Sequence, residues 1–154
     1  MTTATVIYDA DCGFCRWSLA LLLSLDRPGA LRPLPLGTEE ADLLLADLTA
    51  EERNASWHLV VDADPGAAGG AREPTDPGAP LPTRFSAGAA LAPALALLPR
   101  GRRAAALVAR EPELTERGYR WVADHRGLLG RFVPARARRW ADQVIAAGGG
   151  PART

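Results

Sequence analysis

Two cysteines near the start of the chain stand three residues apart, in the segment Cys12-Gly13-Phe14-Cys15. They are the only cysteines among 154 residues, and random placement would give this spacing about once in eighty trials. A pair so spaced exchanges disulfides when one thiolate attacks a substrate disulfide and the other then closes an internal disulfide. The spacing therefore predicts a redox-active pair.

The pair follows a predicted strand and opens a predicted helix. Residues 5–8 form a β-branched and aromatic run that is typical of a buried strand, and a helix is expected from Cys12 to Leu25. A helix N-terminus carries unpaired amides and a partial positive charge, which stabilise a thiolate. We expect Cys12 to attack the substrate, Cys15 to resolve the mixed disulfide, and the two residues between them to set the redox poise.

Two acidic residues, Asp9 and Asp11, precede the cysteines. A carboxylate beside Cys12 opposes thiolate formation, because like charges repel. One interpretation is that an acid accepts the proton of Cys15 during resolution. The alternative is that Asp11 caps the helix through its amides, a role that aspartate often fills. Both acids are candidate catalytic residues.

The cysteine pair also has three non-catalytic interpretations: a structural disulfide, two inert buried thiols, or metal ligands shared across a dimer. The first is uncommon in the cytosol, and the second is possible because free cysteine is often buried. The third needs four ligands from two chains. No metal and no bound cofactor are expected, because the two sulfurs carry the electrons.

The rest of the sequence alternates between predicted strands and helices. Pro33 and Pro35 favour an edge position for the second strand, since proline donates no amide hydrogen bond. The alternation favours parallel pairing of the first three strands, and the last two form a hairpin. We expect an α/β, thioredoxin-like, mixed four-stranded sheet flanked by helices. The further strands are predicted at 31–36, 57–61 and 82–85, and the further helices at 38–48, with a turn at 49–52, and 86–98.

The predicted organisation is one thioredoxin-like domain with a C-terminal helical extension packed on it. Pro112 and Pro134 are expected to break the helical extension. The boundaries are 1–99 for the domain, 64–80 for a flexible Gly- and Pro-rich hairpin loop, 100–147 for the extension and 148–154 for a frayed tail.

The net charge of zero conceals an uneven distribution. Residues 1–99 hold 6 arginines and 13 acids, residues 100–154 hold 12 arginines and 5 acids, and lysine is absent. The basic third predicts either a solvated helical face or a docking surface. The alternative function is therefore a non-catalytic binding module that docks an acidic partner through arginines such as Arg136, Arg138 and Arg139. No nucleic-acid partner is expected, because aromatic residues are not interleaved with the arginines.

A cytoplasmic location without membrane insertion is expected. The longest apolar run, Leu19 to Leu23, is too short to cross a bilayer. The first five residues lack the basic region of a signal peptide. The sequence leaves the oligomeric state open.

The segment from Val6 to Cys15 resembles the opening of the DCC family of thiol–disulfide oxidoreductases, whose Asp…Cys…Cys pattern is carried here by Asp9, Cys12 and Cys15. Weaker similarities lie at 57–62, at 85–91, and at Tyr119 with Asp124-His125-Arg126. The resemblance covers most of residues 5–130. It implies a thioredoxin-like fold and thiol–disulfide exchange. We expect a disulfide-containing protein or a small thiol such as glutathione as the partner.

The sequence departs from thioredoxins where they place a cis-proline before the strand that faces the cysteines. Here Ser56 stands at that position, before Trp57, which argues against ordinary thioredoxin docking. Ser56 and Trp57 are predicted to bind substrate together with Gly13 and Phe14.

Several further residues have a structural and a functional interpretation. Trp17 and His58 are expected to be packing residues rather than a substrate contact and a catalytic base. The residues Tyr119, Asp124, His125 and Arg126 form either a polar network or a set of helix-surface charges beside a half-buried tyrosine.

Overall fold

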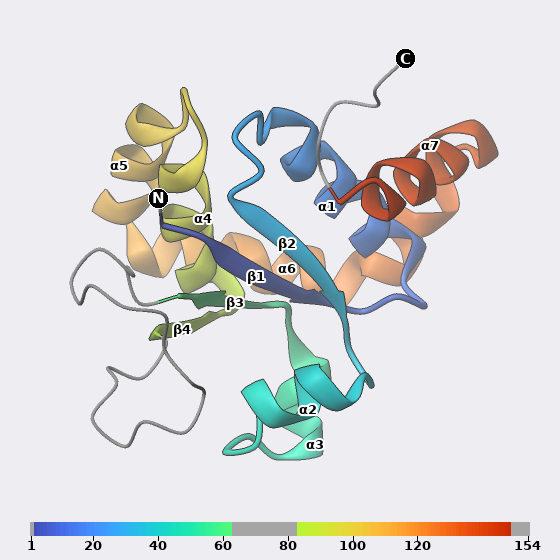
Figure 1. Cartoon of the computed structure of the whole chain (residues 1–154), viewed down its shortest axis with the longest axis horizontal. Coiled ribbons are helices and arrows are strands. Elements are labelled where there is room, and N and C mark those ends of the chain that lie inside the picture. Colours follow the sequence, from blue (N-terminus) through green and yellow to red (C-terminus); the bar gives the residue numbers. More distant parts are fainter. Residues whose placement is uncertain (1, 63–82, 149–154) are drawn as a thin grey trace, which may run out of the picture.

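The computed structural model describes residues 2–62 and 83–148. The predicted loop at 64–80 and most of the predicted tail lie outside these residues. Figure 1 shows one sheet with helices on both of its faces. The elements are, in chain order, β1 (Ala4–Tyr8), α1 (Gly13–Leu25), β2 (Leu31–Pro35), α2 (Glu39–Leu44), α3 (Ala50–Ala55), β3 (His58–Val61), β4 (Thr83–Ser86), the 3₁₀ helix η2 (Ala87–Ala90), α4 (Leu91–Leu97), α5 (Arg102–Arg110), α6 (Pro112–Phe132) and α7 (Ala135–Ala146).

The four strands form a mixed sheet in the order β2-β1-β3-β4. β2 lies at an edge, as its prolines predicted, and pairs parallel with β1. β3 is antiparallel to both β1 and β4, so the predicted hairpin is confirmed but the expectation of three parallel strands is wrong.

The connection between β2 and β3 explains this reversal. A parallel return needs a connection that crosses the whole sheet. α2 and α3 have six residues each, or about 9 Å of helix, which is shorter than a five-residue strand of about 16 Å. The chain therefore re-enters the sheet at the end where β2 stopped, with His58 opposite Ile7.

Alternate residues of the strands enter two hydrophobic clusters, one on each face of the sheet. Val6 and Tyr8 pack with α1 and α4 on one face, whereas Ile7 packs against α2 on the other. Because β1 is buried on both faces, its sequence does not alternate between apolar and polar residues. The larger cluster has its buried residues Leu19, Leu23, Leu59, Ala94 and Leu98 on the face where the cysteine-bearing helix lies.

Helix α1 is held at both ends by side-chain interactions with the backbone. Cys12 is its N-cap residue, and the buried carboxylate of Asp26 at its C-terminus accepts the amides of Ala30 (3.1 Å) and Leu31 (2.7 Å). α6 and α7 pack against it.

Two helix predictions need correction. The helix expected over 38–48 ends at Leu44, and a capping box of Thr49 and Glu52 starts α3, as the turn predicted there suggested. The helix predicted over 86–98 is not a single α-helix, and the hydroxyl group of Ser86 before it is hydrogen bonded to His58. That segment begins as the 3₁₀ helix η2 and continues as α4.

The C-terminal helices break where the prolines predicted. Pro112 starts α6, and Pro134 precedes α7. Among the described residues, none of the helices combines the length and the apolar character that crossing a membrane requires.

α6 packs against the rest of the fold through a close contact between Glu116 and Gly88. The Gly88 amide donates to the Glu116 carboxylate (3.0 Å), and a Cβ at Gly88 would lie 2.9 Å from Glu116 Cα. Only glycine leaves room for this contact. This packing places the middle of α6 in contact with the segment that leads into β3.

Candidate active site

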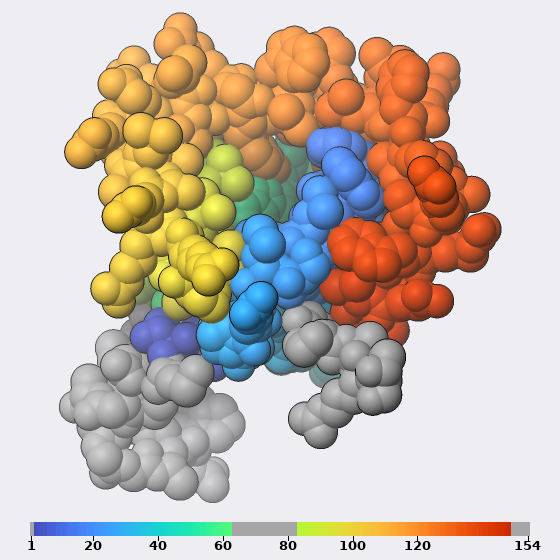
Figure 2. Space-filling view, turned by 90° about the horizontal axis from the view of Figure 1, so that it is seen from above, coloured from blue at the N-terminus to red at the C-terminus, as the bar shows by residue number. Residues whose placement is uncertain are grey.

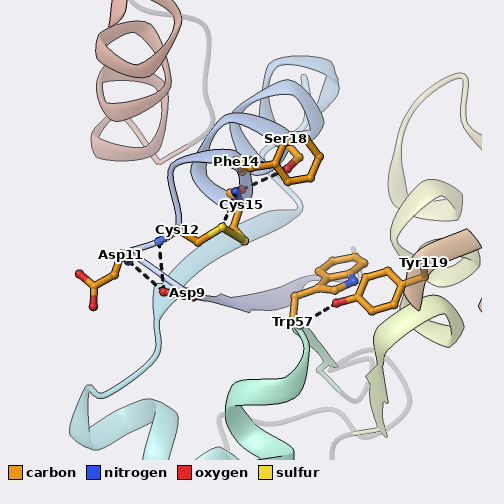
Figure 3. The surroundings of a disulfide bond; sticks show 8 residues. All are labelled: Asp9, Asp11, Cys12, Phe14, Cys15, Ser18, Trp57 and Tyr119. Atoms are coloured by element: carbon orange, nitrogen blue, oxygen red, sulfur yellow. Dashed lines mark hydrogen bonds between the residues drawn. A yellow bond between two sulfur atoms is a disulfide. The ribbon is translucent and has the colours of Figure 1, made fainter. Parts of the chain in front are cut away.

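The two cysteines form a disulfide at the start of α1 (Figure 3). Their Cα atoms are 5.2 Å apart, and both residues are half-buried. The Cys12 sulfur accepts a hydrogen bond from the Cys15 amide (3.2 Å), so it occupies the position of an N-cap acceptor. The positive end of the helix therefore acts on Cys12, as the sequence predicted.

Asp9 holds the turn that leads into the helix. One oxygen of its carboxylate accepts the amides of Asp11 (2.9 Å) and Cys12 (3.2 Å). The prediction that Asp11 caps the helix is wrong, because Cys12 is the N-cap residue and Asp9 binds the preceding amides. The Asp11 side chain is exposed and points away from the sulfurs (Figure 3).

Of the two acids, Asp9 is the one brought to the cysteines. A carboxylate oxygen of Asp9 and the sulfurs of Cys12 and Cys15 lie within 4.8 Å of one another. This arrangement places a carboxylate beside both sulfurs. Once the disulfide is reduced, these three groups are of the types that bind metals, one fewer than the four ligands of a structural zinc site.

The segment before β3 faces the disulfide and is bound by α6. Ser56 ends α3, and the Trp57 amide donates to the Tyr119 hydroxyl oxygen (3.3 Å). Burial raises the pKa of Tyr119. The described peptide bonds are all trans, including the one between Ser56 and Trp57.

The polar network considered for α6 does not form as a unit. Tyr119 is half-buried and bonds to Trp57, whereas His125 bonds to the Trp121 carbonyl (2.7 Å) and stacks on its ring (4.5 Å between centroids). Asp124 is exposed. The half-buried tyrosine of the other interpretation is confirmed, but Arg126 is half-buried rather than a surface charge.

A cavity of about 640 Å³ lies against the disulfide. In Figure 2 it is the hollow between α1 (blue), α4 (yellow-green) and α6 (orange). Cys15 and Asp9 are among its lining residues, and its other polar residues include Tyr119 and Arg126 of α6. Most of the wall is apolar and includes Val6, Leu19, Leu22, Leu91, Leu95 and Val122.

The structure brings together some of the predicted substrate-binding residues. Phe14, Ser56 and Trp57 line the cavity with Cys15, whereas Gly13 is not among its lining residues. The cavity itself could not be predicted from the sequence. The spacing of Thr115, Tyr119, Val122 and Arg126 marks one face of a helix, but it does not show that this face borders a hollow.

Two other candidate residues, His58 and Trp17, make packing and hydrogen-bond contacts typical of structural residues. His58 is buried, with Nδ1 2.7 Å from the Ser86 hydroxyl group and Nε2 3.0 Å from the Arg53 carbonyl, and burial lowers its pKa. Trp17 is half-buried beside Phe14, with 6.0 Å between ring centroids.

Arginines of the C-terminal helices include one with a clear structural role. Arg138 donates to the carbonyls of Val133 and Gly130 (both 3.0 Å) and so joins α7 to the end of α6. Arg136 and Arg139 are exposed.

The comparisons with known proteins identify the family. Neither the curated proteins nor the solved structures give a match. The family model of the DCC1-like thiol-disulfide oxidoreductases matches residues 6–132, from β1 through the cysteine pair to the end of α6. That match spans most of the chain and includes the disulfide, the Asp9 carboxylate and the Tyr119 contact. The chain belongs to the DCC1-like thiol-disulfide oxidoreductase family, and it exchanges disulfides through the cysteine pair at the N-terminus of α1.

Proposed function

We propose that Cys12 is the attacking thiolate, that Cys15 resolves the mixed disulfide, and that Asp9 accepts the Cys15 proton. The observation that supports these roles is the placement of all three groups within 4.8 Å, with the Cys12 sulfur at the N-cap position. The partner is a disulfide-containing protein or a small thiol such as glutathione. Phe14, Ser56 and Trp57, which lie beside Cys15, stay predicted substrate contacts.

The reaction proceeds in two exchanges. The Cys12 thiolate attacks one sulfur of the substrate disulfide, the substrate bond breaks, and the first substrate sulfur leaves as a thiolate. Cys15 then passes its proton to Asp9 and attacks the Cys12 sulfur, which releases the second substrate sulfur as a thiolate. Two electrons move from the enzyme to the substrate, and the Cys12–Cys15 disulfide forms. The reverse sequence oxidises a substrate dithiol.

We assign proton transfer to Asp9 rather than Asp11, because the Asp11 side chain points away from the sulfurs. Gly13 stays a predicted contact, because it lies between the cysteines at the first position of α1. The C-terminal helices belong to the catalytic domain in this proposal, since Tyr119 of α6 binds the Trp57 amide. A cytoplasmic location stays a prediction.

The test is a redox titration of the wild-type protein in graded glutathione buffers, with alkylation of free thiols and mass analysis. A reversible two-electron transition between about −120 and −270 mV is expected, as in other dithiol oxidoreductases. A disulfide that survives well below about −300 mV is structural and would contradict the proposal, as would failure to form a disulfide in any buffer.

Trapping experiments test the order of the two cysteines. Cys15→Ser should accumulate mixed disulfides with a disulfide substrate, because nothing resolves them. Cys12→Ser serves as the matched control and should trap few. If only Cys12→Ser accumulates adducts with disulfide substrates, the assigned order is reversed.

A further inference from the structure

We propose that an apolar small thiol with an anionic group enters the cavity and reduces the enzyme by attacking the Cys15 sulfur, with Cys12 as the leaving thiolate. This inference rests on the proposed disulfide exchange and adds a second point of attack to it. Disulfide substrates meet Cys12, whereas the thiol that recycles the oxidised enzyme meets Cys15.

The position of the cavity relative to the two sulfurs carries the argument. Cys15 lines the cavity and Cys12 does not. Figure 3 shows the disulfide with its Cys15 end turned toward Trp57 and Tyr119, which are also part of the wall. Thiol–disulfide exchange proceeds by attack on one sulfur while the other departs. A thiol in the cavity therefore has Cys15 in front of it and Cys12 as the group that departs.

The surroundings of Cys12 favour its departure. Its sulfur already accepts the Cys15 amide (3.2 Å) at the start of a helix of 13 residues. The same hydrogen bond and the partial positive charge at the helix N-terminus stabilise the Cys12 thiolate that forms when the disulfide bond breaks. The sulfur that leaves is therefore the one whose anion the fold already supports.

The size and lining of the cavity point to a small molecule. A volume of about 640 Å³ lies within the usual range of ligand sites, which is about 300 to 1,000 Å³. A polypeptide that docks by strand addition needs free backbone amides. The Trp57 amide at the cavity is already bound to Tyr119, and α6 occupies the adjacent space.

The polar groups of the wall indicate the ligand's charge and orientation. Arg126 is the one cation of the wall, and in the described part of the chain no carboxylate pairs with it. Tyr119 accepts from Trp57 through its oxygen, which leaves its own hydroxyl hydrogen to donate. Asp9 borders the cavity beside Cys15 and repels an anion there. A ligand is therefore oriented with its sulfur toward Cys15 and its anionic group toward Arg126.

The step balances without a further reagent. The ligand thiol passes its proton to Asp9 and forms a bond to the Cys15 sulfur, the Cys12–Cys15 bond breaks, and Cys12 leaves as a thiolate. A second thiol then attacks the ligand sulfur, which releases the ligand as a symmetrical disulfide and Cys15 as a thiolate. Two thiols are oxidised, and the enzyme gains two electrons.

The probe for the experiment is 4-mercaptobenzoate, an aromatic thiol with a carboxylate. Oxidised wild-type protein is mixed with it, quenched rapidly with excess N-ethylmaleimide, and the peptide with both cysteines is fragmented in the mass spectrometer. We expect mercaptobenzoate on Cys15 and maleimide on Cys12. The opposite arrangement overturns the inference.

Arg126→Gln tests the orientation of the probe. It should slow adduct formation by 4-mercaptobenzoate about tenfold and leave the rate with neutral 4-methylbenzenethiol within about twofold. Arg131→Gln, an exposed arginine on the same helix that does not line the cavity, is the matched control and should change neither rate. If Arg126→Gln slows the reactions of both thiols equally, or if the two variants slow the reaction of 4-mercaptobenzoate equally, a carboxylate contact with Arg126 is contradicted. A normal glutathione titration together with an adduct on Cys12 would reject this inference and leave the proposed function standing.

Discussion

Replacing Asp9 by asparagine should make the enzyme disulfide a stronger oxidant. The wild-type carboxylate repels a thiolate formed beside it, and the asparagine does not. At 4.8 Å, the upper limit of the separations between the carboxylate oxygen and the sulfurs, two unit charges interact by about 0.9 kcal/mol at the dielectric constant of water and by about 3.5 kcal/mol at an effective value of 20. For a two-electron couple, this range corresponds to a rise of about 20 to 75 mV in the reduction potential.

The substitution preserves the local backbone, which makes the comparison interpretable. The asparagine side-chain oxygen can still accept the amides that Asp9 binds at 2.9 and 3.2 Å. Asp11→Asn is the matched control, because that carboxylate is exposed and directed into solvent, and its potential should stay within about 10 mV of the wild type.

Two measurements on Asp9→Asn separate its charge from its role as a base. The glutathione titration reports the potential, and stopped-flow resolution of a preformed mixed disulfide reports proton transfer. We expect the potential to rise while resolution slows by about tenfold or more, because asparagine cannot take the Cys15 proton. An unchanged or lower potential refutes the electrostatic reasoning, and an unchanged resolution rate refutes the role as a base.

Two further predictions concern stability, measured by urea unfolding. Burial lowers the pKa of His58 in the folded protein, so the unfolded chain binds more protons than the folded one. The free energy of unfolding should therefore fall as the pH drops below about 6.5, and this fall should stop once the pH is below the lowered pKa of the folded protein. His58→Gln should lose this part of the pH dependence. If the free energy of unfolding of this variant changes with pH as steeply as that of the wild type between pH 7.5 and 5.5, about one unit either side of 6.5, the assignment to His58 is rejected. Gly88→Ala should cost about 1 to 3 kcal/mol, because the new Cβ would meet Glu116 Cα at 2.9 Å. Gly127→Ala, in the same helix as Glu116 and with no heavy atom within 4 Å of its Cβ position, should be neutral or stabilising, and equal losses at both sites would show that the contact is not the cause.

The chemistry of the cysteine pair could be predicted because its signals are local. The β-branched run before the cysteines, the apolar helix after them and the spacing between them all act within a few residues. The same is true of the edge position of β2, which follows from Pro33 and Pro35, and of the helix breaks at Pro112 and Pro134. Each depends on a property of the residue itself, the missing amide donor of proline.

The choice between Asp9 and Asp11 could not be made from the sequence. Both carboxylates lie within three residues of Cys12, and either side chain is of a type that binds amides before a helix. The turn between β1 and α1 directs Asp9 back toward the amides of Asp11 and Cys12, and it directs the Asp11 side chain into solvent. Backbone direction over that short turn decided which acid faces the sulfurs.

The direction of β3 and the cavity beside Cys15 depended on contacts between distant parts of the chain. The length of α2 and α3 determined where the chain re-entered the sheet, and Tyr119 reaches Trp57 across 62 positions of sequence. The sequence by itself determined that the chain has a dithiol at a helix N-terminus. Only the tertiary structure decided that α6 covers one side of that dithiol and leaves a hollow on the Cys15 side, because side-chain packing between remote elements leaves no periodic pattern in the sequence.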